Sequence, residues 1–303
     1  MSPIELQSRY FNRLKLDPAK LDSEPSFRKL AIIQEAHLAA VPFDNLAQHG
    51  AVGGLAVLDR NATAIKILDR QRGGFCFELN AVLGELLVDL GYGATLLSAF
   101  VYAGDPGYCS FPTHMALIVR CHRDTVQEST HFVDVGFAEP PLHPLVYGTE
   151  SFGIVQETPD GMRSRLLEED GSVVLEWYVA GKWTPRLRWS LEDSMLGDQG
   201  PELASFATAL DSVHEESSIF SQKLISCLIT RTEKVTLAGK RLKITGPPRF
   251  PLEEGAEVSI QQLEGVSEAR IVLRDRFGIP LVETVGLDLT KSSSAAAAVW
   301  AKH

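Results

Sequence analysis

The sequence lacks long hydrophobic runs. No apolar stretch approaches the roughly 18 to 20 residues that a helix needs to cross a bilayer. The first residues, MSPIELQSRYFNRLKL, carry charges where a signal peptide requires an uninterrupted apolar segment. We therefore expect a cytoplasmic protein that has no membrane partner.

Positive charge is also scarce. Lys and Arg together number 29 against 39 Asp and Glu, which gives a net charge of −10 at pH 7. A chain without a surplus of basic side chains cannot neutralise the phosphates of a nucleic acid over a broad surface. The charge balance therefore predicts that the protein has no nucleic-acid partner.

Cysteine is the third scarce feature. The 303 residues include four cysteines, and none of them forms a C-x-x-C pair. A disulfide framework and a zinc ribbon are therefore not indicated. The first interpretation of each cysteine is a small buried hydrophobic residue, so a cysteine with a chemical role must be identified by its neighbours.

The remaining composition is that of a globular protein, with 45% hydrophobic and 22% charged residues. The periodicity divides the chain into three parts, which we expect at 1–91, 92–195 and 196–303. The first part reads as helical, at 4–15, 25–40, 62–70 and 75–90. The second contains six short apolar segments joined by turns, at 95–102, 114–121, 131–137, 163–167, 173–179 and 184–189.

No helical pattern separates those six segments, so an antiparallel sheet or a small barrel is favoured over a parallel α/β sheet. The third part is mixed. Residues 191–229 read as helical again, followed by strands at 234–237 and 241–244 and a helix at 266–274. The expected fold class is thus α+β.

One cysteine is distinguished by its neighbours. In the stretch from Arg72 to Asn80 (RGGFCFELN), two glycines precede Cys76, which is expected in the first turn of a helix. Free N–H groups and the helix dipole stabilise an anion there, so a thiolate is favoured. The same N–H groups could hold an oxyanion, and the glycines would let a substrate approach the sulfur. The alternative is a buried cysteine behind a Gly-Gly turn.

A thiol nucleophile needs a base. His114 begins an apolar strand directly after Pro112 and Thr113, so its ring could be held rigidly at the mouth of a cleft. The alternative is a hydrogen-bonded histidine at a strand end with no chemical role.

A third group would fix the imidazole. Asp134 is flanked by apolar residues within the expected strand at 131–137, where an unpaired carboxylate is costly. The alternative is an aspartate that faces water on an edge strand. Asp44 and Glu78 also lie in apolar contexts, but pairing with Arg72 would explain either of them.

The chain order Cys76, His114, Asp134 is that of nucleophile, base and orienting group in papain-like enzymes, and it indicates acyl transfer through a thioester. The intervals of 38 and 20 residues are shorter, however, and the papain signature around the cysteine is absent. A cysteine hydrolase, a transglutaminase-like enzyme and a catalytically silent scaffold therefore remain alternatives.

Four motifs in this order resemble the arylamine N-acetyltransferase family. They are the Arg-Gly-Gly-aromatic-Cys stretch at Arg72–Cys76, the Val-Pro-Phe-acid-Asn-Leu stretch at Val41–Leu46, the histidine at Thr113–Met115 and the Asp-Val-Gly-Phe stretch at Asp134–Phe137. The likeness is dense from about residue 25 to about residue 140. It implies a helical bundle, a central antiparallel β-barrel and a C-terminal α/β lid around a cysteine-protease-like catalytic core.

The resemblance also implies a reaction. An acetyl group would pass from acetyl-coenzyme A to an arylamine, an arylhydroxylamine or a hydrazine by a ping-pong mechanism through an acyl-cysteine. Acetyl-coenzyme A would be a co-substrate, with no permanently bound cofactor and no metal. Cys76 would be the nucleophile, His114 the base and Asp134 the orienting carboxylate.

Further residues are implied by position. Phe43, Val101 and Phe137 would line the acceptor pocket, although each also has a plain core interpretation. Asp44 and Arg72 would give structural support. Here Asp44 replaces the usual glutamate, so a bridge to Arg72 must shift or lengthen.

Two more departures, the insertion-like stretch at 50–61 and the acidic Glu139, are expected to alter the entrance and the acceptor preference. Family relatives include acylases that prefer malonyl donors and amide synthases that close macrocycles, so malonyl-coenzyme A and amide synthesis remain alternatives. A basic residue in the acyl pocket would indicate a malonyl donor, and the sequence alone does not place one.

Overall fold

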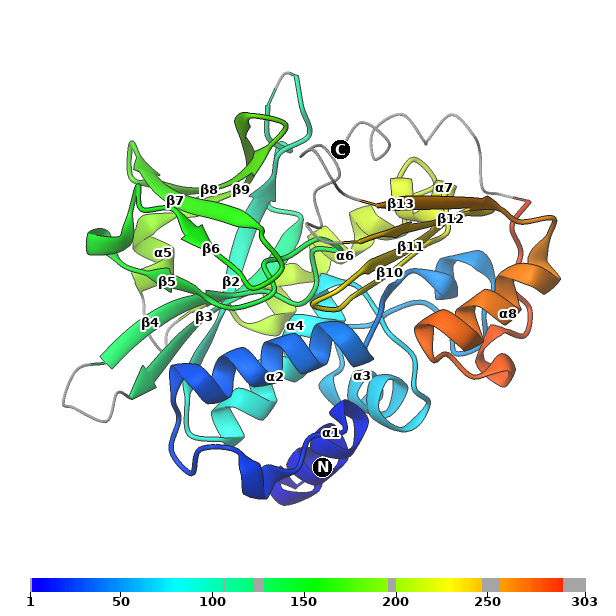
Figure 1. Ribbon diagram of the computed structural model, residues 1–303, viewed down its shortest axis with the longest axis horizontal. Coiled ribbons are helices and arrows are strands. Elements are labelled where there is room, and N and C mark those ends of the chain that lie inside the picture. The colour runs from blue at the N-terminus through cyan, green and yellow to red at the C-terminus, as the bar shows by residue number, and fades with distance from the viewer. Residues whose placement is uncertain (1, 106, 123–127, 196–199, 247–256, 291–303) are drawn as a thin grey trace.

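A computed structural model describes residues 2–105, 107–122, 128–195, 200–246 and 257–290. Figure 1 shows an eight-stranded barrel on one side, a second sheet on the other, and the N-terminal helices below both. The fold class predicted from the sequence, α+β with a helical bundle and an antiparallel barrel, is confirmed. The boundaries predicted at residues 91/92 and 195/196 stay predictions.

The N-terminal part of the chain is helical. Its helices are α1 (Pro3–Leu14), α2 (Phe27–Ala40), α3 (Arg60–Ala64), which continues into a π-helical turn at Ile65–Asp69, and α4 (Cys76–Asp89). The hydroxyls of Ser2 and Ser26 accept hydrogen bonds from backbone N–H groups in the first turns of α1 and α2. Most residues of α4 are buried, so this helix is the core of the bundle.

The barrel is antiparallel throughout. In sheet order its strands are β5 (Leu145–Tyr147), β4 (Glu128–Val133), β3 (His114–His122), β2 (Gly93–Val101), β9 (Lys182–Ser190), β8 (Ser172–Val179), β7 (Arg163–Glu169) and β6 (Gln156–Glu157). Its two edges are joined by a side chain. The Val146 N–H donates to Gln156 Oε1 (2.7 Å), and Gln156 Nε2 donates to the Val146 carbonyl (2.9 Å). The Gln156 carboxamide thus takes the place of a peptide group in the ladder. It supplies hydrogen-bond partners for the N–H and the carbonyl of Val146 on the edge strand β5.

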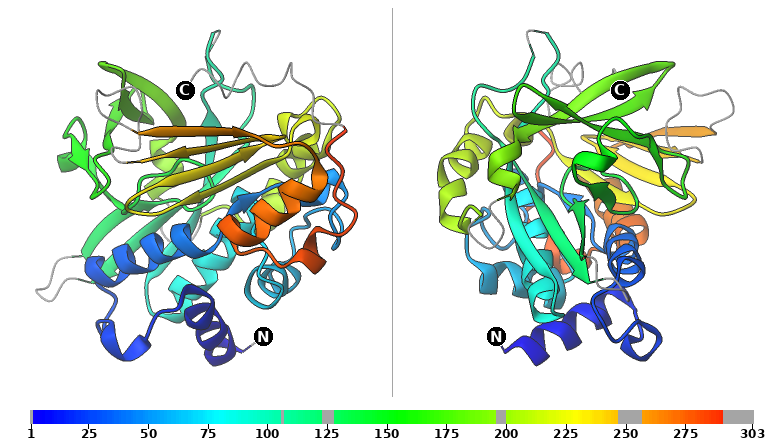
Figure 2. Two further views of the ribbon diagram at one scale, coloured as in Figure 1. Left: turned by 45° about the vertical axis from the view of Figure 1, so that its right-hand side comes forward. Right: turned by 90° about the vertical axis from the view of Figure 1, so that its left-hand side faces the viewer.

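The second sheet has the order β1 (Phe43–Asp44), β10 (Ile225–Ile229), β11 (Lys234–Ala238), β12 (Arg241–Thr245) and β13 (Val258–Gln262). Helix α8 (Val266–Phe277) lies against one face of this sheet, as the views of Figure 2 show, and shares a hydrophobic core with it. Three shorter helices lie between β9 and β10 in the chain: α5 (Leu191–Met195), α6 (Ala207–His214) and α7 (Ile219–Gln222).

The helical interpretation of residues 191–229 is wrong at its end, because Ile225–Ile229 is strand β10. Strands β1, β5, β6 and β13 were not expected. Strand β1 comes from the N-terminal part of the chain and pairs with β10, with Phe43 opposite Cys227. The sequence-distant parts of the protein are therefore joined by backbone hydrogen bonds.

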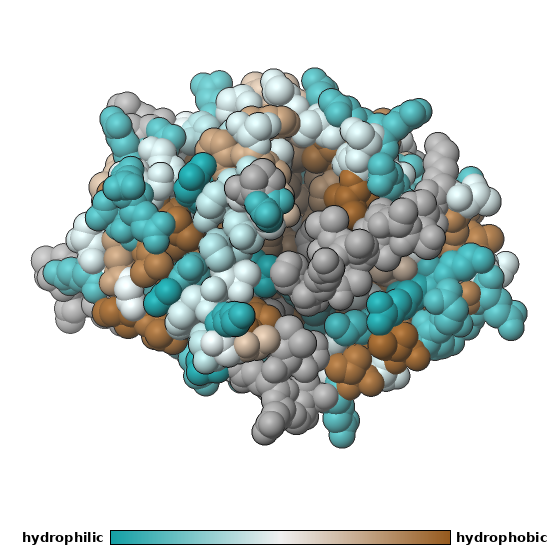
Figure 3. All heavy atoms as spheres, turned by 90° about the horizontal axis from the view of Figure 1, so that it is seen from above, coloured by the Kyte–Doolittle hydropathy of each residue, from teal (hydrophilic) through white to brown (hydrophobic). Residues whose placement is uncertain are grey.

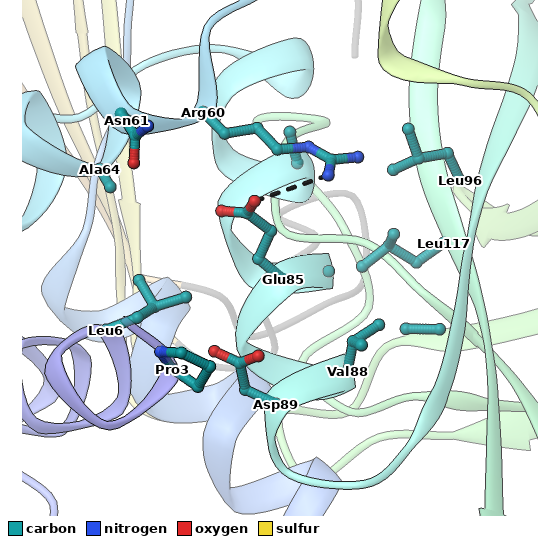
Figure 4. A pocket seen from close by; sticks show the side chains of 13 residues that line it. Pro3, Leu6, Arg60, Asn61, Ala64, Glu85, Val88, Asp89, Leu96 and Leu117 are labelled. Carbon is teal, nitrogen blue, oxygen red and sulfur yellow. Dashed lines mark ion pairs between the residues drawn. The ribbon is translucent and has the colours of Figure 1, made fainter. Parts of the chain in front are cut away.

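A cavity of about 270 Å³ lies between α1, α3, α4 and the strands β2 and β3 (Figure 4). Arg60 and Glu85, which line it, form an ion pair of 3.5 Å. Burial raises the pKa of Glu85 and of Asp89. None of the described residues that line this cavity is one that the sequence proposed for the site.

In the part of the chain that the structure describes, we find no helix with the length and apolarity that crossing a membrane demands.

Glu283, in the C-terminal part of the chain, binds two arginines that lie shortly before Cys76 in the sequence. Glu283 accepts hydrogen bonds from Arg70 Nε (3.0 Å) and Nη2 (2.6 Å) and lies 3.9 Å from Arg72 Nη1. Glu283 is 8% exposed and Arg72 is 1% exposed. Since removing one partner leaves a buried cation poorly compensated, we expect Glu283→Ala to lower the free energy of unfolding by about 2 kcal/mol.

Urea unfolding followed by circular dichroism would measure this loss. The matched control is Glu5→Ala, which removes an exposed partner of Arg9 and should change stability by less than about 0.5 kcal/mol. Equal effects of the two substitutions would contradict the role given to Glu283.

Candidate active site

Cys76 is the first residue of α4, as the sequence predicted. The preceding Phe75 is extended, and its N–H donates to Glu78 Oε2 (3.3 Å), which is the reciprocal half of a capping box. Lys66 Nζ holds the other carboxylate oxygen of Glu78 at 2.7 Å. Cys76 is 7% exposed, so its sulfur lies at a helix N-terminus with little solvent around it.

His114 is the first residue of β3 and touches both other members of the predicted triad. Its Nε2 lies 2.8 Å from Asp134 Oδ2, and its ring is hydrogen-bonded to Cys76. Burial lowers the pKa of His114, but the Asp134 carboxylate and the Cys76 sulfur more than offset it and raise the pKa to about 10. The imidazole is therefore protonated at neutral pH.

Asp134 follows β4 and does not lie inside a strand. The expected strand at 131–137 is wrong at its end, because β4 stops at Val133. The carboxylate is buried, and its Oδ1 accepts hydrogen bonds from Asn80 Nδ2 (2.9 Å) and the Gly136 N–H (2.7 Å). Because both oxygens are occupied, the paired interpretation of Asp134 holds and the water-facing one does not.

Asn80 is a residue that the sequence reasoning missed. It lies one helical turn after Cys76 on α4 and is fully buried. Its amide donates to Asp134 and to the Met115 carbonyl (2.6 Å), and its Oδ1 accepts from the Val135 N–H (3.0 Å). The spacing of four residues puts Asn80 on the helix face of Cys76, which is the signal that could have identified it.

Gly136 brings the loop after β4 onto the nucleophile. A Cβ at this position would lie 2.5 Å from Cys76 Cα and 2.9 Å from Asn80 Nδ2. Close backbone contact therefore sets the distance between this loop and α4. Since Asp134 lies on the same loop, the contact also fixes the carboxylate.

The two glycines before Cys76 serve packing. A Cβ at Gly73 would lie 1.8 Å from the Pro42 carbonyl oxygen, and one at Gly74 would lie 2.5 Å from Glu78 Oε2. The structure thus gives close packing against protein atoms as a reason for these glycines, and the access for a substrate that the sequence suggested stays a prediction.

The expected bridge between Asp44 and Arg72 is formed, in spite of the shorter acid. Arg72 Nη2 donates to Asp44 Oδ1 at 3.1 Å, and the Gly73 N–H donates to Oδ2 at 2.8 Å. Burial alone would raise the pKa of Asp44, but Arg72 and the hydrogen bonds lower it below its ordinary value. The Asp44 N–H also donates to the Gly74 carbonyl (2.8 Å), so the backbones lie close enough for aspartate to reach.

The three residues expected in the acceptor pocket occupy different places. The Phe137 ring meets the His114 ring edge-on, with centroids 5.1 Å apart. Val101 ends β2 and packs against the barrel core. Phe43 belongs to the core of the bundle and contacts Phe220, at 5.9 Å between ring centroids. The structure thus brings Phe137 to the triad and gives Val101 and Phe43 packing positions.

Figure 3, a view from above, shows a hollow in the surface between the barrel and the second sheet, with hydrophobic residues on its visible walls. Glu139, expected near the entrance, is paired with Lys234 of β11. The acid is therefore neutralised by a partner from the second sheet.

This chain is similar to proteins of known function. Residues 26–285 match the family described as N-acetyltransferase. The chain is 30% identical over 271 residues to the arylamine N-acetyltransferase / N-hydroxyarylamine O-acetyltransferase of Salmonella typhimurium, covering 89% of this chain and 87% of that protein. It is 28% identical over 284 residues to the arylamine N-acetyltransferase of Mycolicibacterium smegmatis, covering 92% and 94%.

The solved structure of the Mycobacterium marinum arylamine N-acetyltransferase in complex with CoA is similar throughout. The TM-score is 0.77 at 26% identity, with 97% of this chain and 99% of that chain covered. The fold and the site define an α+β protein with a cysteine–histidine–aspartate centre at a helix N-terminus. This chain belongs to the arylamine N-acetyltransferase family.

The first prediction at the site concerns the charge of His114. Replacing Asp134 by Asn removes the carboxylate that stabilises the imidazolium, so the pKa of His114 should fall from about 10. NMR titration of the ring would measure the change. We expect kcat/KM to fall by roughly 10²- to 10⁴-fold.

The raised pKa of His114 also makes the stability of the folded protein depend on pH. The pKa of His114 is raised in the folded state, so the stability it contributes is complete below pH 6.5 and is lost as the pH rises towards about 10. Asp134→Asn should lose this pH dependence. The control is Glu35→Gln, which disturbs His143 and should leave the titration of His114 unchanged. An unchanged His114 pKa in Asp134→Asn would contradict the geometry.

The second prediction concerns the close contact at Gly136. Gly136→Ala should force the loop away from Cys76, displace Asp134 and lower kcat/KM by about 10²-fold. Overpacking should also cost about 1 to 3 kcal/mol of stability. Gly265→Ala is the control, because a Cβ there meets open space and the backbone is extended. Full activity of Gly136→Ala would rule out the positional role of this contact.

Proposed function

We propose that this protein transfers an acetyl group from acetyl-coenzyme A to arylamines, arylhydroxylamines or hydrazines through an acetyl-Cys76 intermediate. The observation that carries the proposal is the buried contact chain from Cys76 through His114 to Asp134. Membership in the arylamine N-acetyltransferase family supports the substrate class.

The first half-reaction forms the acetyl-enzyme. The Cys76 thiolate attacks the carbonyl carbon of the thioester, and backbone N–H groups in the first turn of α4, including that of Cys76, stabilise the oxyanion. The bond between the carbonyl and the coenzyme A sulfur then breaks. His114 gives its proton to the departing thiolate. Because one thioester replaces another, the step is close to neutral in free energy.

The second half-reaction releases the product. His114 is now neutral at the nitrogen that faces Cys76 and accepts a proton from the attacking amine. The amine nitrogen bonds to the acetyl carbon, the Cys76 sulfur leaves as a thiolate, and the ion pair with His114 is restored. An aryl amine is only weakly basic, so it is unprotonated and nucleophilic at neutral pH.

Other side chains orient His114 and Cys76. Asp134 holds the imidazole through Nε2, which directs the other nitrogen to the sulfur. Asn80 is a positioning residue, because it holds Asp134 while it lies on the helix of Cys76. Phe137 packs on the imidazole, and with Val101 and Phe43 it is proposed to line the acceptor pocket. Asp44 and Arg72 are proposed to support the loop before Cys76.

The partners follow from this chemistry. They are a coenzyme A thioester as donor and a small arylamine or hydrazine as acceptor, with no permanently bound cofactor, no metal and no nucleic acid. We also propose a cytoplasmic location, where acetyl-coenzyme A is made and used.

The test is covalent capture. Incubation with acetyl-coenzyme A should leave one acetyl group on the protein, located on Cys76 by intact-mass measurement and peptide mapping. Cys76→Ser should lower the rate of acetyl transfer to an arylamine by at least about 10³-fold. Cys109→Ser is the matched control, since Cys109 is also a free thiol and is more exposed than Cys76. Undiminished turnover in Cys76→Ala would refute the mechanism.

A further inference from the structure

Glu78 is a buried acid beside the nucleophile that the proposed mechanism does not use. It is 2% exposed and is the third residue of α4, two positions after Cys76. Its Oε2 accepts the hydrogen bond of the Phe75 N–H at 3.3 Å. A Cβ on Gly74 would lie 2.5 Å from the same oxygen, so the carboxylate folds back over the backbone that leads to the sulfur. The Glu78 carboxylate therefore helps to fix where α4 begins.

A carboxylate at this position opposes the chemistry of the site. The first turn of α4 has to stabilise the negative charge that forms on the carbonyl oxygen of the substrate when Cys76 attacks. A second negative charge in the same turn repels that oxygen, and a buried environment screens the repulsion poorly. The charge of Glu78 therefore needs a cation close by.

Lys66 supplies that cation. Its Nζ lies 2.7 Å from Glu78 Oε1, and the Lys66 side chain is 17% exposed. Within the described ranges of the chain, no second basic side chain lies within 4.0 Å of the Glu78 oxygens. Arg72, which the sequence offered as a partner, lies with Asp44 (3.1 Å) and Glu283 (3.9 Å) instead. The compensation of the Glu78 charge therefore depends on Lys66.

The local backbone explains how Lys66 reaches this carboxylate. Lys66 lies in the π-helical turn Ile65–Asp69, a rare conformation that occurs frequently at functional sites. Its carbonyl accepts a hydrogen bond from the Arg72 N–H at 3.1 Å. The backbone of Lys66 is thus bound to a residue before Cys76, and its side chain is bound to a residue after it. Lys66 therefore connects the two sides of the nucleophile.

We propose that Lys66 is a positioning residue for the acyl-transfer step, which it supports through Glu78. By binding this carboxylate, Lys66 keeps the cap in place over the Phe75 N–H. It also offsets a negative charge that would otherwise oppose the oxyanion at the start of α4. This inference rests on the proposed acyl-transfer function.

The test is the rate at which Cys76 is acetylated in a single turnover, measured by rapid quenching and intact mass. Lys66→Met keeps most of the length of the side chain and removes the ammonium group. At saturating acetyl-coenzyme A, we expect it to lower the acetylation rate about ten- to a hundredfold. The donor concentration that gives half of the maximal rate should change by less than about threefold, because Lys66 acts through Glu78. An unchanged maximal rate would overturn the proposal.

A second substitution, at Glu78, should restore the rate. Glu78→Gln keeps an oxygen that can accept the Phe75 N–H and carries no charge, so it needs no cation. The double variant Lys66→Met/Glu78→Gln should therefore acetylate Cys76 within about threefold of the rate of the unsubstituted protein. Lys66→Arg should retain most of the rate, since it keeps the positive charge. A double variant as slow as Lys66→Met would contradict a role that runs through Glu78.

The matched control is Arg165→Met in the barrel. Arg165 on β7 is paired with Glu176 on β8 at 2.6 Å, and the two side chains are 26% and 12% exposed. Its loss also removes one partner of a mostly buried ion pair, but the acetylation rate should stay within about threefold. Circular dichroism gives the temperatures at which every variant is folded, and the rates are compared there. Equal losses of rate in Lys66→Met and Arg165→Met would reduce Lys66 to a structural role and overturn the proposal.

A pair of alkylating reagents tests the charge directly. Iodoacetate is an anion and iodoacetamide is neutral, and both alkylate a cysteine sulfur. In Lys66→Met, alkylation of Cys76 by iodoacetate should become at least about threefold slower relative to iodoacetamide, and Glu78→Gln in the same chain should restore the ratio. Peptide mapping assigns the label, since Cys109 is also a free thiol. A ratio that Lys66→Met leaves unchanged would overturn the proposal.

A second variant keeps the test open if Lys66→Met does not fold. Lys66→Gln also removes the charge, while its amide can still donate a hydrogen bond to Glu78. It should slow the acetylation of Cys76 in the same direction and be restored by Glu78→Gln, and the opposite result would again overturn the proposal. Failure of the proposed function itself would be seen separately, because the unsubstituted protein would then gain no acetyl group on Cys76.

Discussion

The hydrogen bond between His114 Nε2 and Asp134 Oδ2 is the constraint on which the rest of the structure depends. It occupies one nitrogen of the ring and leaves the other for Cys76, so it fixes both the orientation and the charge of the imidazole. A charged pair of this kind is costly to bury unless every oxygen of the carboxylate is satisfied. Asn80 and the Gly136 backbone provide those bonds. The three groups come from α4, β3 and the loop after β4, so they meet only when the helical bundle docks on the barrel.

That docking relies on backbone contacts that admit no side chain. Gly136 lies against Cys76, and Gly73 lies against the carbonyl of Pro42. Both contacts are set by chain atoms that cannot change rotamer, which makes the position of the sulfur insensitive to side-chain motion. The Asp44 carboxylate then binds the N–H of Gly73 and the guanidinium of Arg72, and Glu283 closes the same network from the C-terminal part of the chain. The loop before the nucleophile is thus held from both ends of the sequence.

Local patterns predicted much of this architecture. The helices around Leu6, Leu30 and Leu83 have caps and periodicity that the chain itself displays, and the antiparallel order of the barrel followed from short strands without intervening helices. The triad could be proposed because each member has an unusual neighbourhood. Strand β10 could not be separated from the helical pattern before it, since a short apolar run fits either state. The two-residue strand β1 is defined by its partner and not by its own sequence.

Arg186 illustrates the same limit in the barrel. In sequence it is one of three basic residues in a strand that alternates regularly enough to place it on the outside. Only the register shift against β8 turns it towards Trp177, and a register shift depends on both strands at once. Arg72 shows the contrasting case, since it is also buried but meets Asp44 within the fold. A charge that the protein neutralises serves the structure. Arg186 instead meets the face of an aromatic ring, that of Trp177, and neither strand alone predicts this contact.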